Sequence, residues 1–137
     1  MAEKLGRVAV IAYLDTHVAA ALAQGEQRKL PRAARQIIQK RSLRISPMAL
    51  LELGYLYEIH RTVVPAVQVA AKLQAELGVE VCDFPFSKIA YAALGESWTR
   101  DAFDRTIVAH ARANGTAPLI TSDRKIQANY AEAVWDD

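Results

Sequence analysis

The sequence predicts an α/β fold in which helices cover both faces of a parallel sheet. Short apolar segments alternate along the chain with segments of helical periodicity, which is the pattern of strand–helix–strand units with right-handed crossovers. The first of these segments, Val8–Leu14, is apolar at every position instead of alternating. A continuous apolar run of this length is typical of a strand that is buried on both faces of a parallel sheet.

The first elements follow from local signals. A short helix, His17–Gln24, follows the first strand and ends at a polar break, residues 25–29. Pro31 suits the first position of the next helix, because its fixed φ favours a helix start. Leu43–Ile45 is predicted as the second strand. The apolar stripe of the Pro31 helix consists of Ala33, Ala34, Ile37 and Ile38.

The middle of the chain contains two more helices and an edge strand. Ser46 and Pro47 are a suitable N-cap and first residue for a helix that reaches about Arg61. Pro65 begins a further helix that ends near Gly78. Val79–Cys82 alternates between apolar and polar positions, as a half-exposed edge strand does.

The last third repeats the pattern. Phe86–Leu94 and Asp101–Asn114 are predicted helices, and Gly115 supplies a left-handed residue after the second. Pro118–Ser122 is the fourth strand, and a short helix starts at Asp123. Ala133–Trp135 is the last strand.

Composition excludes several classes of protein. The 137 residues are 52% hydrophobic, which suits one compact domain, residues 1–137, and argues against general disorder. No apolar run reaches the ~20 residues of a membrane span. The single cysteine, Cys82, cannot form an internal disulfide, and the N-terminus lacks an apolar signal sequence, so a cytoplasmic location is expected. Three scattered histidines share no ligand spacing, which argues against a zinc site.

Four acidic residues are the candidate catalytic groups. Asp15 and Asp123 directly follow the first and fourth strands, and ligands of parallel sheets bind beyond the carboxyl ends of the strands. Glu52 lies on a helix that is apolar in nearly every direction, and Asp104 lies beside inward-facing residues of its helix. Carboxylates crowded at one edge repel one another unless a cation lies among them, so the pattern predicts a site for a hard divalent metal.

Each acid also has a structural alternative. Asp15 and Asp123 could cap the helices that follow them. Asp101 and Asp104 could form the N-cap and third residue of a capping box. Glu52 could form a buried ion pair with an arginine, because an isolated buried carboxylate is unfavourable.

Four blocks of the sequence contain the acids and their neighbours: Tyr13–Val18, Ile45–Gly54, Arg100–Ala111 and Leu119–Ile126. Together they resemble the PIN-domain family, most of all the VapC-type toxin ribonucleases of type II toxin–antitoxin pairs. The similarity extends from Val8 to Trp135, with the blocks in the family's order and spacing. One departure is Ala102, where proline is common in this branch.

The resemblance implies a five-stranded parallel sheet in the order 3-2-1-4-5, in a PIN-like three-layer sandwich with helices on both faces. It implies a Mg²⁺-dependent endoribonuclease, with Mn²⁺ as an alternative ion, in which a metal-activated water attacks the phosphodiester. Asp15 and Asp104 are the expected direct metal ligands, Asp123 acts through water or a second ion, and Glu52 orients the attacking water. A homodimer and an antitoxin that inserts a basic residue among the acids are the expected protein partners.

Other residues are secondary candidates for the site or its substrate. Asp101 and the hydroxyls of Thr16, Ser46 and Thr121 are expected near the acids, although caps and strand threonines explain the hydroxyls equally well. Arg105, together with Arg100 and Arg124, could balance the acids or contact the scissile phosphate. Tyr13, Tyr55 and Tyr57 are expected in the core.

The segment Arg28–Arg44 contains seven basic residues and no acidic one, so it could contact RNA phosphates or simply be a solvated helix face. The expected antitoxin groove lies on the apolar surface of Leu30–Arg41 and Met48–Arg61. Two other functions remain open: a Mg²⁺-dependent phosphohydrolase with Asp15 as nucleophile, and a non-catalytic binding module. A haloacid-dehalogenase-type site needs a second aspartate two residues after the first, and here that residue is His17.

Overall fold

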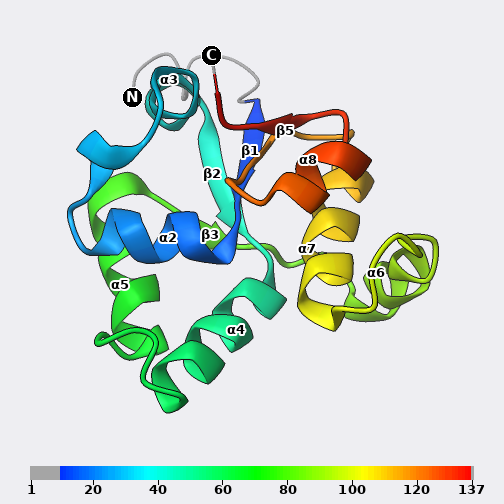
Figure 1. Ribbon diagram of the computed structural model, residues 1–137, viewed down its shortest axis with the longest axis horizontal. Helices are drawn as coiled ribbons and strands as arrows, with labels where there is room; N and C mark the ends of the chain where they lie inside the picture. Colours follow the sequence, from blue (N-terminus) through cyan, green and yellow to red (C-terminus); the bar gives the residue numbers. More distant parts are fainter. Residues whose placement is uncertain (1–9, 137) are drawn as a thin grey trace.

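Five parallel strands form the centre of the protein (Figure 1). A computed structural model describes residues 10–136. The strand order is β3-β2-β1-β4-β5, so the predicted order is confirmed, with β1 in the middle. The first predicted strand begins later than expected, and Val8 and Ala9 lie outside the described residues. The strands are β1 (Ile11–Leu14), β2 (Ser42–Ile45), β3 (Glu80–Val81), β4 (Leu119–Ile120) and β5 (Ala133–Val134).

Helices connect the strands close to the predicted positions. Pro31 and Pro65 are N-caps instead of first helical residues, because their ψ angles of 160° and 147° are extended. The helix that contains Glu52 ends at Glu58, three residues before the predicted end, and His60 then adopts a positive φ of 61°. The helices are α2 (Thr16–Ala23), α3 (Arg32–Lys40), α4 (Pro47–Glu58), α5 (Ala66–Leu77), α6 (Phe86–Ala93), α7 (Ala102–Ala113) and α8 (Arg124–Asn129), with a 3₁₀ turn η1 (Gln27–Lys29) before α3.

The connections determine where a ligand can bind. From β1 the chain moves outward to β2 and β3, then returns to the other side of β1 to form β4 and β5. Right-handed crossovers in these opposite directions place α2–α5 on one face of the sheet and α6–α8 on the other. The direction of winding changes between β1 and β4, and the crevice beyond the carboxyl ends of these strands is the expected ligand site.

The two strands that end at this crevice, β1 and β4, lie in the hydrophobic core. Ala12, Tyr13 and Leu14 of β1 and both residues of β4 are fully buried, because helices cover both faces of the central strands. Tyr13 lies in the core as predicted, and its hydroxyl donates to Cys82 Sγ at 3.1 Å.

The prediction that Tyr55 and Tyr57 lie in the core is wrong. Helix α4 has an exposed side, since Leu51 and Tyr55 are 60% and 50% exposed and Tyr57 is also exposed. The Tyr55 ring lies 6.1 Å from that of Phe103 on α7, so the two aromatic residues form a surface contact between α4 and α7. No helix within residues 10–136 has the length and apolar character needed to cross a membrane.

Candidate functional site

Asp15 lies at the carboxyl end of β1, directly beside the end of β4. Its backbone N–H donates to the carbonyl of Ile120 at 3.0 Å, which extends the pairing of the two strands by one residue. Thr121, the residue after β4, therefore lies beside Asp15, and its hydroxyl donates to Asp15 Oδ2 at 2.6 Å. Both residues are buried. The second oxygen of Asp15 accepts from the N–H of Thr16 at 2.8 Å, so the carboxylate is held at both oxygens and also caps α2.

The Glu52 side chain extends from α4 toward the start of α2, next to Asp15. Its Oε1 accepts from the hydroxyl of Thr16 at 2.5 Å, and Thr16 is fully buried. Glu52 forms no ion pair with an arginine among the described residues, so the ion-pair alternative does not describe it. Thr16 and Thr121 thus hold Glu52 and Asp15 next to each other through short hydrogen bonds from two buried hydroxyls.

The remaining acids lie at the starts of two helices. Asp123 caps α8 by accepting from the N–H groups of Lys125 and Ile126, and its own N–H donates to the Thr121 hydroxyl at 3.0 Å. Asp101 caps α7 by accepting from the N–H of Asp104 at 3.1 Å. The reciprocal bond of a capping box is absent, because the Asp101 N–H donates to Thr99 instead. The Asp104 carboxylate forms no hydrogen bond within the described part of the chain.

The carboxylates lie close enough to influence one another's ionisation. Burial raises the pKa of Asp104 most, the negative charges of Asp101, Asp15, Asp123 and Glu52 add to the shift in that order, and together they bring this pKa to about 7. Burial also raises the pKa of Asp15 and of Glu52, with Asp123 adding to the first shift and Asp15 and Asp101 to the second. We call the five residues the acidic cluster. Within residues 10–136, no basic side chain forms an ion pair with any of them.

The acidic cluster fits a hard divalent cation. Its donors are all carboxylate oxygens, it lacks a paired cation, and the Asp104 carboxylate has no other partner. Among the described residues no three acids stand close enough to enclose an ion by themselves. Mg²⁺ suits such an arrangement, because it keeps several waters and needs only one or two direct carboxylates.

Two secondary candidates, Ser46 and Arg105, form their side-chain hydrogen bonds with residues outside the acidic cluster. The Ser46 hydroxyl accepts from the N–H of Met48 and lies 2.9 Å from His110 Nδ1, so Ser46 caps α4 and joins it to α7. Arg105 Nε donates to the carbonyl of Thr99 at 2.7 Å, which anchors the loop before α7. Both residues support the helices that contain Glu52 and Asp104, and within residues 10–136 neither forms a hydrogen bond or ion pair with those acids.

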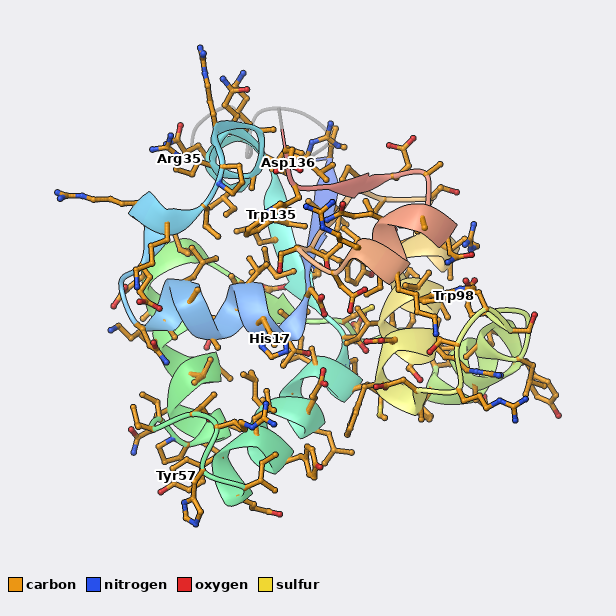
Figure 2. All side chains as sticks on the ribbon, in the orientation of Figure 1. His17, Arg35, Tyr57, Trp98, Trp135 and Asp136 are labelled. Carbon is orange, nitrogen blue, oxygen red and sulfur yellow. The ribbon has the colours of Figure 1, made fainter. Side chains whose placement is uncertain are left out.

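Sequence reasoning missed two features, one beside the acids and one in the loop before α7. His17 is exposed at the start of α2 (Figure 2), and its charge lowers the pKa of Asp15 and of Glu52. Glu96 is buried and accepts from Trp98 Nε1 at 2.9 Å and from Arg112 Nε at 2.8 Å, which ties the loop before Asp101 to α7. The proximity of His17 to Asp15 in sequence was a usable signal for the first feature. Nothing in the segment Gly95–Thr99 distinguishes Glu96 from an ordinary loop acid.

The raised pKa of Asp104 predicts how stability depends on pH without a divalent cation. Between an unfolded value near 4 and the folded value of about 7, the folded state binds more protons than the unfolded state. The free energy of unfolding should therefore decrease as pH rises through this window. In EDTA, the melting temperature should fall between about pH 5 and about pH 8, and Mg²⁺ should reverse the fall. A melting temperature that rises steadily over this range would contradict the proposed repulsion.

Comparisons with known proteins identify the family and the fold of this chain. A model of the family described as "PIN domain" matches residues 12–132. The chain belongs to the PIN-domain family. PIN domains are typically nucleases, which are hydrolases, and these nucleases generally use divalent metals.

Two solved structures share the fold of this PIN domain. One is VapBC2 from Rickettsia felis bound to a DNA fragment from their promoter, with 19% identity over 93% of this chain and 98% of that chain and a TM-score of 0.56. The other is PAE2754 from Pyrobaculum aerophilum, with 22% identity over 94% of this chain and 90% of that chain and the same TM-score of 0.56. No curated protein matches the chain.

Proposed function

We propose that this PIN domain is a metal-dependent endoribonuclease and the toxin of a toxin–antitoxin pair. The observation that supports this proposal most is the acidic cluster, whose five carboxylates lie near the switch point of the sheet with no ion-pair partner among residues 10–136. The proposed substrate is cellular RNA, which would place the activity in the cytoplasm. Mg²⁺ is the proposed ion and Mn²⁺ the alternative.

The proposed roles follow from the contacts of each acid. Asp15 and Asp104 would hold the cation directly, Asp15 because Thr121 and Thr16 fix its orientation and Asp104 because its oxygens have no other partner. Asp123 would contact the ion through water, since one of its oxygens already caps α8. A divalent cation in this position would activate water and neutralise charge on the phosphate.

Glu52 is the proposed proton acceptor. Thr16 occupies one of its oxygens, which leaves the other free to orient a water molecule and accept its proton. Its raised pKa suits this role, because a general base works best when its pKa lies near the working pH.

A cleavage assay tests the proposed activity. The purified chain should cut single-stranded RNA with Mg²⁺ or Mn²⁺, lose this activity in EDTA and leave a phosphomonoester such as p-nitrophenyl phosphate intact. Release of phosphate from the monoester without RNA cleavage would instead support a phosphohydrolase with Asp15 as nucleophile. Metal binding without either activity would support a binding module.

The proposed antitoxin would cover the acids and the neighbouring surface of α4. A lysine or arginine inserted into the acidic cluster would relieve its repulsion by a charge-assisted contact. Leu51 and Tyr55 are exposed on the helix that contains Glu52, and they offer apolar surface for an amphipathic segment of the partner. VapBC2 from Rickettsia felis, which shares the fold, was determined bound to promoter DNA.

The expected position of the antitoxin groove needs one correction. Helix α3 offers no apolar wall, because Leu30, Ala34 and Ile38 are buried and no large hydrophobic residue between 24 and 42 is exposed.

A homodimer is also proposed, and sedimentation equilibrium would test it.

A further inference from the structure

The exposed basic residues of η1 and α3 form a surface at the opposite end of the sheet from the acids. Helix α3 ends where β2 begins, whereas the acids follow the carboxyl ends of β1 and β4. A strand of four residues separates the two ends, which is about 13 Å. Figure 1 shows α3 at one end of the sheet, and Figure 2 labels Arg35 there, well away from His17 beside the acids.

Four cations of this surface are exposed and lie close together in sequence. On α3, residues 32, 35, 36, 39 and 40 are all exposed and none is acidic, while Ala34 and Ile38 face the core. Within residues 10–136, none of the four cations forms an ion pair. We call the surface made by Arg28, Arg32, Arg35 and Lys40 the α3 basic face.

Two other basic residues of the segment Arg28–Arg44 do not belong to this surface. Arg44 lies in β2, donates to the carbonyl of Leu43 and stands 3.8 Å from Glu80 on β3. Lys29 pairs with Glu26 at 2.5 Å. The sequence segment Arg28–Arg44 is therefore not one surface, and Lys29 and Arg44 are not part of the α3 basic face.

We propose that the α3 basic face is a second contact site for the phosphate backbone of RNA, remote from the acidic cluster. Three of its four cations are arginines, whose planar guanidinium groups match phosphate oxygens in a bidentate manner. Phosphate contacts hold and orient a nucleic acid without selecting its sequence. The site rests on the proposed ribonuclease function, since it would hold the same RNA that the acidic cluster cuts.

The composition of the face favours RNA over other anionic partners. A membrane surface or a protein partner normally also requires apolar side chains. The large exposed hydrophobic residues lie elsewhere, for example Leu51 on α4 and Tyr91 on α6, and none lies between residues 24 and 42. A face of arginine, lysine and glutamine alone is suited to a chain of phosphates.

The separation of the two sites makes the proposal sensitive to RNA length. An RNA must extend at least about 13 Å past the acids to reach the α3 basic face. Longer RNA should therefore use both sites, whereas a dinucleotide, whose single phosphate would lie at the acids, should use only the acidic cluster.

The test compares two double variants with the same change in net charge. Arg32→Gln with Arg35→Gln removes two cations from the face, and Lys72→Gln with Lys88→Gln removes two exposed cations from α5 and α6. Binding of a fluorescein-labelled single-stranded RNA of about 25 nucleotides is measured by anisotropy in EDTA at several salt concentrations. The first variant should bind about tenfold more weakly, and the slope of log affinity against log salt should be shallower by about 1.4, since each single-strand contact contributes about 0.7.

Cleavage kinetics in Mg²⁺ complete the test. The first variant should raise KM for the long RNA about tenfold with kcat unchanged, and it should leave the cleavage of a dinucleotide unaltered. Equal effects of both double variants, or no effect of either on binding, would overturn the proposal. Unchanged RNA binding combined with weaker binding of the co-expressed antitoxin would assign the face to a protein instead. Wild-type protein that binds long RNA through this face but cuts none would overturn the ribonuclease function and leave the RNA contact standing.

Discussion

Replacing Asp104 with asparagine should reduce metal-dependent RNA cleavage by at least about a hundredfold while making the metal-free protein more stable. The substitution keeps the shape of the side chain and removes the charge that would hold the cation. It also removes a carboxylate whose pKa is raised to about 7 by burial and by the other acids. Because Asp104 is partly exposed, the gain in the free energy of unfolding at neutral pH should be about 1–2 kcal/mol, well below the full value of the shift.

Thermal unfolding and cleavage assays check both parts of this prediction. In EDTA at about pH 8, Asp104→Asn should melt at a higher temperature than the wild type, and added Mg²⁺ should stabilise the wild type alone. Asp101→Asn is the matched control, because asparagine keeps the cap on the Asp104 N–H and so should cost less activity. If Asp101→Asn is the more damaging variant, the roles of the two aspartates are the reverse of those proposed.

Expression of this chain alone in a bacterial host should arrest growth, and Asp15→Asn should relieve the arrest. Asp15 lies at the centre of the hydrogen bonds that join β1, β4 and α4 to the acidic cluster. Asparagine has the same shape but no charge, so the protein should fold without holding the cation. Colony counts after induction measure the effect, with immunoblots to confirm equal amounts of protein.

Asp83→Asn provides the control for this experiment, because Asp83 is exposed in the loop between β3 and α6. This variant should remain as toxic as the wild type. Normal growth with abundant, folded and RNA-cleaving wild-type protein would refute the toxin role and leave the nuclease intact. Toxicity that Asp15→Asn does not relieve would show that the arrest has another cause.

Much of the fold follows from the sequence because the signals are local. The unbroken apolar run before Asp15 predicts a central strand, and β1 occupies that place with buried residues. Ser46 and Pro47 mark the start of α4, as the cap to Met48 shows. The extent of α4 and the exposure of Tyr55 could not be predicted in this way, because they depend on which side of the helix faces α5 and α7.

The arrangement of the site needed information that the sequence does not contain. The sequence identifies Thr121 as a candidate hydroxyl, but its bond to Asp15 depends on the register in which β4 pairs with β1. The bond from Thr16 to Glu52 depends on how α4 packs near the start of α2. The basic segment shows the same limit most clearly, since a continuous stretch of sequence is divided between a helix face and an inner strand of the sheet.

The loop before α7 has a consequence for the timescale of events at the acids. Glu96 is held by Trp98 and Arg112, and Thr99 is bound through its hydroxyl by Asp101 and through its carbonyl by Arg105. Most surface loops open readily, but opening this one requires several buried or charge-assisted bonds to break together. The Asp101 amide should therefore exchange its hydrogen slowly even without ligand. Binding at this end of the protein should then be governed by diffusion and dehydration of the incoming ion instead of by a slow ordering of the loop.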